Sequence, residues 1–259
     1  MQSVEMLITP SQATEWLETK NTRNRKLSMK RAAMYASDIT NGKWRKTHQG
    51  IAFYDDGILA DGQTRLKAVE IANMPVSMLV TFGLPESASL GIDSHRMRST
   101  ANQIEIDGKS TWIGKGEVAT ARTLLRASGR PDNMSTSQII DYCESKKESI
   151  LFAVDNLRTN SRSITPAAIK AAVSSAFANE STSSLQNFCN VLTTGIMKAE
   201  TEVAAIRLRE RLLQDGSAMQ ATSAGRIEAF MLTQKAIKAF CLGQNIKRLI
   251  APNSLIYLP

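Results

Sequence analysis

The chain has few of the residues that build metal sites and covalent cross-links. Its 259 residues include three cysteines and two histidines. The cysteines, Cys143, Cys189 and Cys241, lie far apart and form no Cys-x-x-Cys pair, which argues against a structural zinc site. Each one stands among apolar residues at helical spacing. We therefore expect three small hydrophobes packed in a core, in a protein of a reducing compartment.

Long apolar runs are also missing. No stretch approaches the roughly 18 apolar residues that a membrane helix needs. Residues 1–10 contain no basic segment followed by an apolar run, so we expect no signal peptide and no membrane span. Together with the cysteine usage, this predicts a cytoplasmic protein.

Positive charge is what the chain has in excess. It carries 32 Lys and Arg against 24 Asp and Glu, which gives a net charge of +8. Each cation can displace a counterion from a phosphate, so this excess favours a polyanionic partner such as DNA or a nucleotide. The alternative is a basic soluble protein without such a partner.

Short β-like runs are confined to the first part of the chain. Residues 6–8 and 76–82 read as strands, and residues 51–59 read as a hairpin around an Asp-Asp-Gly turn. Later segments show helical periodicity without a β-like run. The pattern predicts an α+β protein, with a small mixed α/β domain over residues 1–108 and an all-α helical domain over residues 109–259.

The most informative segment is Asp61-Gly62-Gln63-Thr64-Arg65, which follows the hairpin and opens a helix. The first amides of that helix and its positive dipole end suit an anion, and Gly62 allows a close backbone approach. Arg65 can offer a bidentate fork to a phosphate. Asp61 can hold Arg65, hold a metal or act as a base. The alternative is an Asx turn, with Asp61 capping the helix and Arg65 in solvent.

This segment resembles the Asp-Gly-x-His-Arg-Leu signature of ParB-like and DGQHR-type domains, whose fold is shared with sulfiredoxin. The order of the surrounding features is similar too: a strand, a capped helix, the Asn24-Arg25 loop, a second helix, the hairpin, the motif helix and a β-run. The resemblance covers about residues 5–108. It implies a ParB/sulfiredoxin-like first domain in a protein of the kind found in phages and mobile elements.

The resemblance also implies a nucleotide-phosphate site and its ligand, a nucleoside triphosphate with magnesium. The residues that match are Asn24, Arg25, Gly62, Gln63, Thr64 and Arg65. Thr64 stands where the family has histidine. A threonine hydroxyl can donate to a phosphate but cannot be a general base near neutral pH, so this departure weakens catalysis by the loop and leaves binding intact.

A second group of charged residues follows the β-run, at Asp93, His95, Arg96 and Arg98. It resembles an Asp-x-x-x-x-Arg-Ser/Thr segment of the same family. Arg96 and Arg98 are expected to clamp a phosphate, while Asp93 and His95 join Asp61 as candidate catalytic groups. The alternative is a solvated basic loop. The sequence predicts no metal site made of protein ligands alone.

The helical half offers candidate DNA contacts. Arg207 and Arg211 share a helix face at i, i+4, and Lys247 and Arg248 follow near the end of the sequence. The alternative is a solvated charged face, which is the commoner role of such residues.

Three functions are compatible with these patterns. The first is a nucleotide- or DNA-binding protein of a phage or mobile element, with phosphate bound at the loop from Asp61 to Arg65. The second is a ParB-like nuclease, NTPase or phosphotransferase. The third is an interaction protein that inhibits a host factor. A homodimer is compatible with all three.

Overall fold

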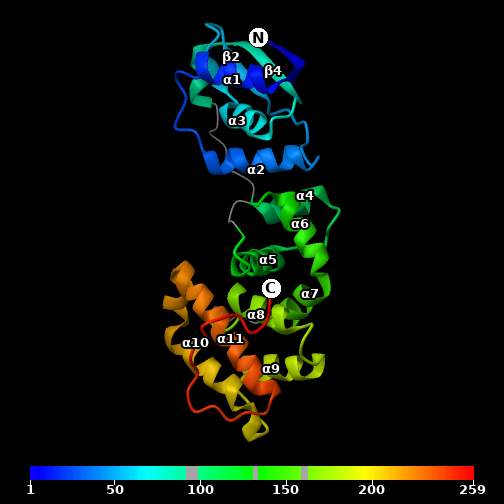
Figure 1. The fold of residues 1–259 in the computed structure, drawn as a ribbon, viewed down its shortest axis with the longest axis vertical. Coiled ribbons are helices and arrows are strands. Elements are labelled where there is room, and N and C mark those ends of the chain that lie inside the picture. The colour runs from blue at the N-terminus through cyan, green and yellow to red at the C-terminus, as the bar shows by residue number, and fades with distance from the viewer. Residues whose placement is uncertain (92–98, 131–133, 159–162) are drawn as a thin grey trace. The chain divides into compact units, whose positions relative to one another are not determined.

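A computed structural model describes residues 1–91, 99–130, 134–158 and 163–259. The chain is an α+β protein that divides into two compact units (Figure 1). The first unit is Met1–Arg98 with Asn133–Ser137, and the second is Ser99–Asp132 with Gln138–Pro259. The sequence places the boundary after residue 108, whereas the helix α4 (Thr100–Asp107) lies in the second unit, where it contacts α5.

The first unit contains a four-stranded sheet in the order β1-β4-β2-β3. Its strands are β1 (Gln2–Ile8), β2 (Ile51–Tyr54), β3 (Leu59–Asp61) and β4 (Val76–Leu84). β4 pairs antiparallel with β1 and parallel with β2, while β2 and β3 form the predicted hairpin. Buried Val76, Met78 and Val80 alternate with more exposed residues along β4, as expected for a strand with one face on a core.

Three helices complete the first unit: α1 (Pro10–Thr19), α2 (Met29–Thr40) and α3 (Gln63–Ala72). Thr9 caps α1, because its hydroxyl accepts from the amide of Gln12 at 3.2 Å, and Pro10 occupies the first turn. α3 contacts both α1 and α2, and links β3 to β4 (Figure 1). Trp16 of α1 meets Phe53 of β2 edge to face, with ring centroids 4.9 Å apart.

The described part of the second unit contains helices and turns and no strand. Its other elements are α5 (Lys115–Ala127), α6 (Thr136–Ser145), α7 (Lys147–Asn156), α8 (Ala167–Ala176), α9 (Thr182–Thr194), α10 (Val203–Ala221) and α11 (Ser223–Cys241). Short 3-10 turns, η1 (Glu86–Gly91) and η2 (Glu200–Glu202), precede α4 and α10. α8 is almost wholly buried against α5, α7 and α11, which explains its run of alanine and serine.

The two longest helices, α10 and α11, pack against each other over much of their length (Figure 1). Thr222 separates them and caps α11 through the amide of Gly225, at 3.0 Å. In the parts of the chain that the structure describes, no helix combines the length and the apolar character that a membrane crossing requires.

Candidate functional site

The predicted loop opens onto a cavity of about 310 Å³ in the first unit. The walls come from the loop before α2, from α2 itself, from the ends of β2 and β3, and from the start of α3. They are lined by Arg23, Asn24, Arg25, Arg31, Tyr35, Tyr54, Ala60, Asp61, Gly62, Gln63, Thr64 and Arg65. The structure therefore gathers at one cavity the two segments that the sequence singled out separately.

Gly62 makes the sharp passage from β3 to α3. Its φ of 105° lies in the left-handed region, where residues with a Cβ are strained. A Cβ at this position would also lie 3.0 Å from both Cα and Cγ1 of Ile51. Glycine thus satisfies two requirements here, a backbone angle and a close approach to β2.

The helix start presents polar backbone to the cavity. Gln63 and Thr64 occupy the first positions of α3, where the helix itself offers their amides no acceptor. The Gly62 amide donates to Oδ1 of Asp61 at 2.6 Å, but the N-cap of α3 is Gly62 and no side chain caps this helix, so the alternative in which Asp61 caps it is wrong. The remaining amides and the Thr64 hydroxyl can donate to an anion at the positive end of the helix.

Arg65 is held rather than solvated. Its Nη1 donates to the carbonyl of Gly50 at 3.0 Å, and its Nη2 donates to Oε1 of Gln49 at 3.4 Å. Nη1 also lies 3.6 Å from Oδ2 of Asp61, and the side chain is 15% exposed. Arg65 therefore combines two of the roles predicted from sequence: it is a structural partner of Asp61 and it lines the cavity.

Two residues predicted to bind phosphate use their side chains to fix the loop around Asn24. Gln63 donates from Nε2 to the carbonyl of Arg25 at 2.9 Å and accepts from Asn21 at 3.3 Å. Asn24 donates from Nδ2 to the carbonyl of Leu59 at 2.7 Å. Both side chains tie this loop to β3 and α3, so they shape the cavity wall through the backbone that they hold.

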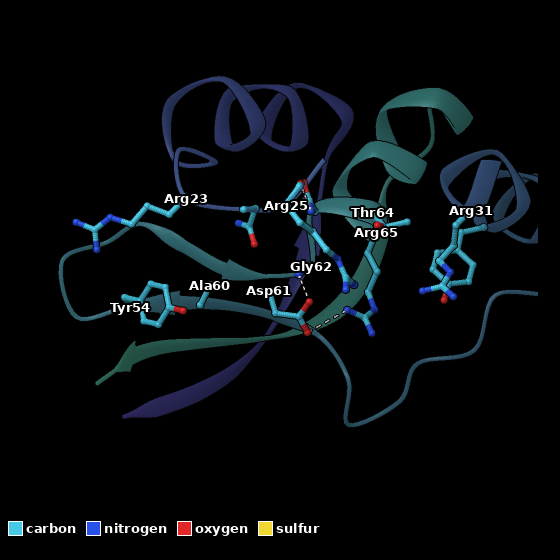
Figure 2. Close-up of a pocket in the computed structure, with 12 residues that line it drawn as sticks. Arg23, Arg25, Arg31, Tyr54, Ala60, Asp61, Gly62, Thr64 and Arg65 are labelled. Carbon is cyan, nitrogen blue, oxygen red and sulfur yellow. Dashed lines mark hydrogen bonds and ion pairs between the residues drawn. The ribbon is translucent and has the colours of Figure 1, made fainter. Parts of the chain in front are cut away.

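The cavity wall carries more positive than negative charge. Four arginines line it, and Asp61 is the one carboxylate among the described lining residues. Arg25, Asp61 and Arg65 point toward one another beside Gly62, whereas Arg23 points away (Figure 2). Arg23 is neutralised there by Asp56 at 3.3 Å and Glu86 at 3.1 Å. An anion in the cavity would thus face Arg25, Arg31 and Arg65.

Sequence reasoning missed Arg31, Tyr35 and Tyr54 as members of the wall. Arg31 follows the cap Ser28 in the first turn of α2, a position typical of a solvated residue. Tyr35 also packs against the core of the first unit, where its ring meets that of Trp44 edge to face, with centroids 5.8 Å apart. No local pattern distinguishes residues that reach a cavity from a neighbouring helix, because that depends on how α2 packs.

The second predicted group, Asp93, His95, Arg96 and Arg98, lies outside the described residues. Within the described ranges, no three His, Cys, Asp or Glu side chains gather as a metal site would require. Among the described residues, Asp61 alone offers the cavity a carboxylate. That donor set fits a magnesium ion that is held mainly by phosphate oxygens, because magnesium sites commonly use one or two carboxylates with substrate phosphates.

The predicted DNA contacts also meet at one place. Arg207, Arg211, Lys247 and Arg248 all line a separate cavity of about 430 Å³ in the second unit. The cysteines behave as expected for packed residues: Cys143 and Cys189 are buried, and Cys241 is partly buried.

In comparisons with known proteins, no family model, curated protein or solved structure matches this chain.

Proposed function

We propose that the first unit binds the phosphate of a nucleotide in the cavity at Gly62. The observation that carries the proposal is the convergence of the α3 N-terminus with Arg25, Arg31 and Arg65 on one cavity. Oriented amides and guanidinium groups are the donors that proteins use for phosphate. The size of the cavity, about 310 Å³, falls at the lower end of the range for small-molecule sites.

The binding contacts follow from the positions of these groups. Phosphate oxygens would accept from the first amides of α3, from the Thr64 hydroxyl and from the arginine forks. Asp61 would repel a bare phosphate, so a magnesium ion between the Asp61 carboxylate and the phosphate would remove that repulsion. We therefore expect a nucleoside triphosphate with magnesium to bind better than the nucleotide alone.

A nuclease, NTPase or phosphotransferase activity of the ParB-like kind is the second candidate. It is favoured by one observation, the Asp61 carboxylate in the wall of the cavity. Asp93 and His95 would supply the other catalytic groups. The link to phages and mobile elements is supported by the resemblance of the Asp61–Arg65 segment and its context.

Arg65 provides the sharpest test of the binding proposal. Arg65→Ala should weaken nucleotide binding by about tenfold to a hundredfold, because a charge-assisted hydrogen bond contributes roughly 1.5–3 kcal/mol. Arg65→Lys should be intermediate, since it keeps the charge and loses the fork. Binding is measured by calorimetry with a panel of nucleoside triphosphates, with and without magnesium, on protein shown by circular dichroism to be folded.

Arg45→Ala is the matched control for this experiment. Arg45 also donates its guanidinium to backbone carbonyls, those of Gly42 and Trp44, but it does not line the cavity. We expect its nucleotide affinity to equal that of the unsubstituted protein. A lowered melting temperature with unchanged affinity in Arg65→Ala would make Arg65 purely structural. Failure of every nucleotide to bind the unsubstituted protein would overturn the proposed function.

A further inference from the structure

The cavity of the second unit is built from one helix pair and one loop. α10 contributes Arg207 and Arg211, and α11 contributes Glu228 and Leu232. The segment that follows α11 contributes Lys247, Arg248, Leu249, Ile250 and Ala251. Four cations and two carboxylates, Glu210 and Glu228, thus line a cavity of about 430 Å³. Positive charge is in excess there, so the ligand that the cavity suits carries more than one negative group.

The loop with Lys247 and Arg248 is anchored at both ends. It leaves α11 after Cys241 and returns to the same helix at Gln234, which is fully buried. Oε1 of Gln234 accepts from the amide of Ile256 at 2.9 Å, and its Nε2 donates to the carbonyl of Tyr257 at 2.7 Å. The hydroxyl of Tyr257 donates to Glu180 at 2.7 Å. The two cations therefore sit on a closed loop, which lowers the entropy cost of presenting them to a ligand.

The four cations differ in how much of their charge is already used. Arg207 pairs with Glu210 at 3.1 Å, and Arg211 pairs with Asp215 at 2.5 Å. These pairs lie on an exposed helix face, where ion pairs contribute only about 0–1 kcal/mol, so a phosphate can compete for both arginines. Within the described ranges, Lys247 and Arg248 have no acidic partner. They supply the unbalanced charge of the cavity.

We propose that this cavity is a docking site for the sugar-phosphate backbone of DNA. Lys247 and Arg248 would hold one phosphate group, and Arg207 and Arg211 would hold others along the strand. The two arginines are one helical turn apart, about 6 Å along the axis, so they present two donors in a row along the wall of the cavity. Leu249 and Ile250 would lie against the apolar parts of the sugars. The site lies in a different unit from the nucleotide cavity, and its test is independent of Arg65.

The test compares two double variants of the full chain that remove the same charge. Lys247→Ala/Arg248→Ala removes the loop cations, and Lys146→Ala/Lys147→Ala removes two adjacent lysines of the same unit that do not line the cavity. Binding of a fluorescein-labelled DNA duplex and of its single strand is followed by anisotropy between about 50 and 200 mM salt. Circular dichroism and the melting temperature report whether each variant is folded.

We expect the loop variant to weaken binding and to lower the slope of log affinity against log salt by about 0.9, because Lys247 and Arg248 share one phosphate contact and each such contact contributes about 0.9 for duplex DNA. The lysine control should keep the slope of the unsubstituted protein, and so should Arg65→Ala. Equal loss in both double variants, an unchanged slope in the loop variant, or no DNA binding at about 50 mM salt would overturn the proposal. Loop-dependent stabilisation by sodium tripolyphosphate without DNA binding would also overturn it, in favour of a small polyanion.

Discussion

Gly62 is the residue on which the first cavity depends most directly. It joins β3 to α3 with a φ of 105°, and it allows β2 to approach within contact distance. Its importance could be predicted, because an Asp-Gly pair between a strand and a helix marks a position of this kind. The roles of Gln63 and Asn24 could not be predicted from the sequence. Nothing in the sequence shows that these side chains bind the carbonyls of Arg25 and Leu59.

Gly62→Ala should destabilise the first unit more than Gly57→Ala. Both glycines have a positive φ, 105° and 80°, and each substitution should cost about 1–2 kcal/mol for that reason. Alanine at residue 62 meets Ile51 as well, whereas nothing lies within 4 Å of a Cβ at residue 57. Urea unfolding of both variants measures the difference. Equal losses would mean that β2 relaxes away from the new methyl group without cost.

At the scale of the element, the residue at which a helix begins is easier to predict from the sequence than the number of helices in a helical stretch. A threonine followed by proline is typical of a helix start, and in the structure Thr9 caps α1 through the amide of Gln12. Local pattern does not separate α7 from α6, because Lys147–Asn156 follows α6 with neither glycine nor proline between them. β1 begins at Gln2, before the predicted residue 6, because an edge strand tolerates polar Ser3 and Glu5.

The anchor at the end of the loop after α11 gives a prediction at this scale. Tyr257→Phe removes the hydroxyl that donates to Glu180 and should cost about 1–3 kcal/mol, because the largely buried carboxylate then loses one of its donors and keeps Lys238 at 3.0 Å. Tyr142→Phe is the matched control, since the buried Tyr142 hydroxyl has no partner within the described residues. Its removal should be neutral or stabilising in thermal unfolding. A similar loss in both variants would contradict a specific role for the Tyr257 hydroxyl.

At the scale of the whole molecule, the thiols and the tyrosine whose pKa burial raises most among the described residues lie in the helical unit. Burial raises the pKa of the Cys143, Cys189 and Cys241 thiols to about 12 from an ordinary value of 9.0. Burial, and then the neighbouring Glu180 carboxylate, raises the pKa of Tyr257 as well. In the unfolded chain these groups ionise at lower pH. The folded state therefore binds more protons between about pH 9 and pH 12.

The contribution of these groups to stability should consequently be constant below about pH 9 and fall as the pH rises toward 12. The thiol of Cys189 should contribute a loss of up to about 1.4 kcal/mol for each pH unit in that window. Urea midpoints from far-UV circular dichroism, taken at intervals from about pH 7 to pH 11, measure the effect. Cys189→Ala should be less stable at neutral pH and should show a shallower alkaline decline. Parallel declines in both proteins would exclude the buried thiol as a cause.

The general division into a sheet-containing part and a helical part could be predicted, because β-like runs end with β4. The composition of either cavity could not be predicted in full. Arg31 and Tyr35 reach the first cavity from α2, and Glu228 and Leu232 reach the second from α11. Membership of this kind is set by the packing of helices that are distant in sequence, which local patterns do not encode.

The position of β1 in the sheet has a consequence for synthesis on the ribosome. Gln2 pairs with Phe82, so the first strand to be made is bonded to the last one. At a translation rate of roughly 5–20 residues per second, about 4–16 s pass between the synthesis of Gln2 and that of Phe82. β4 also lies between β1 and β2, so the earlier strands cannot form their sheet without it. Every residue that lines the first cavity is therefore translated before the strand that completes its support.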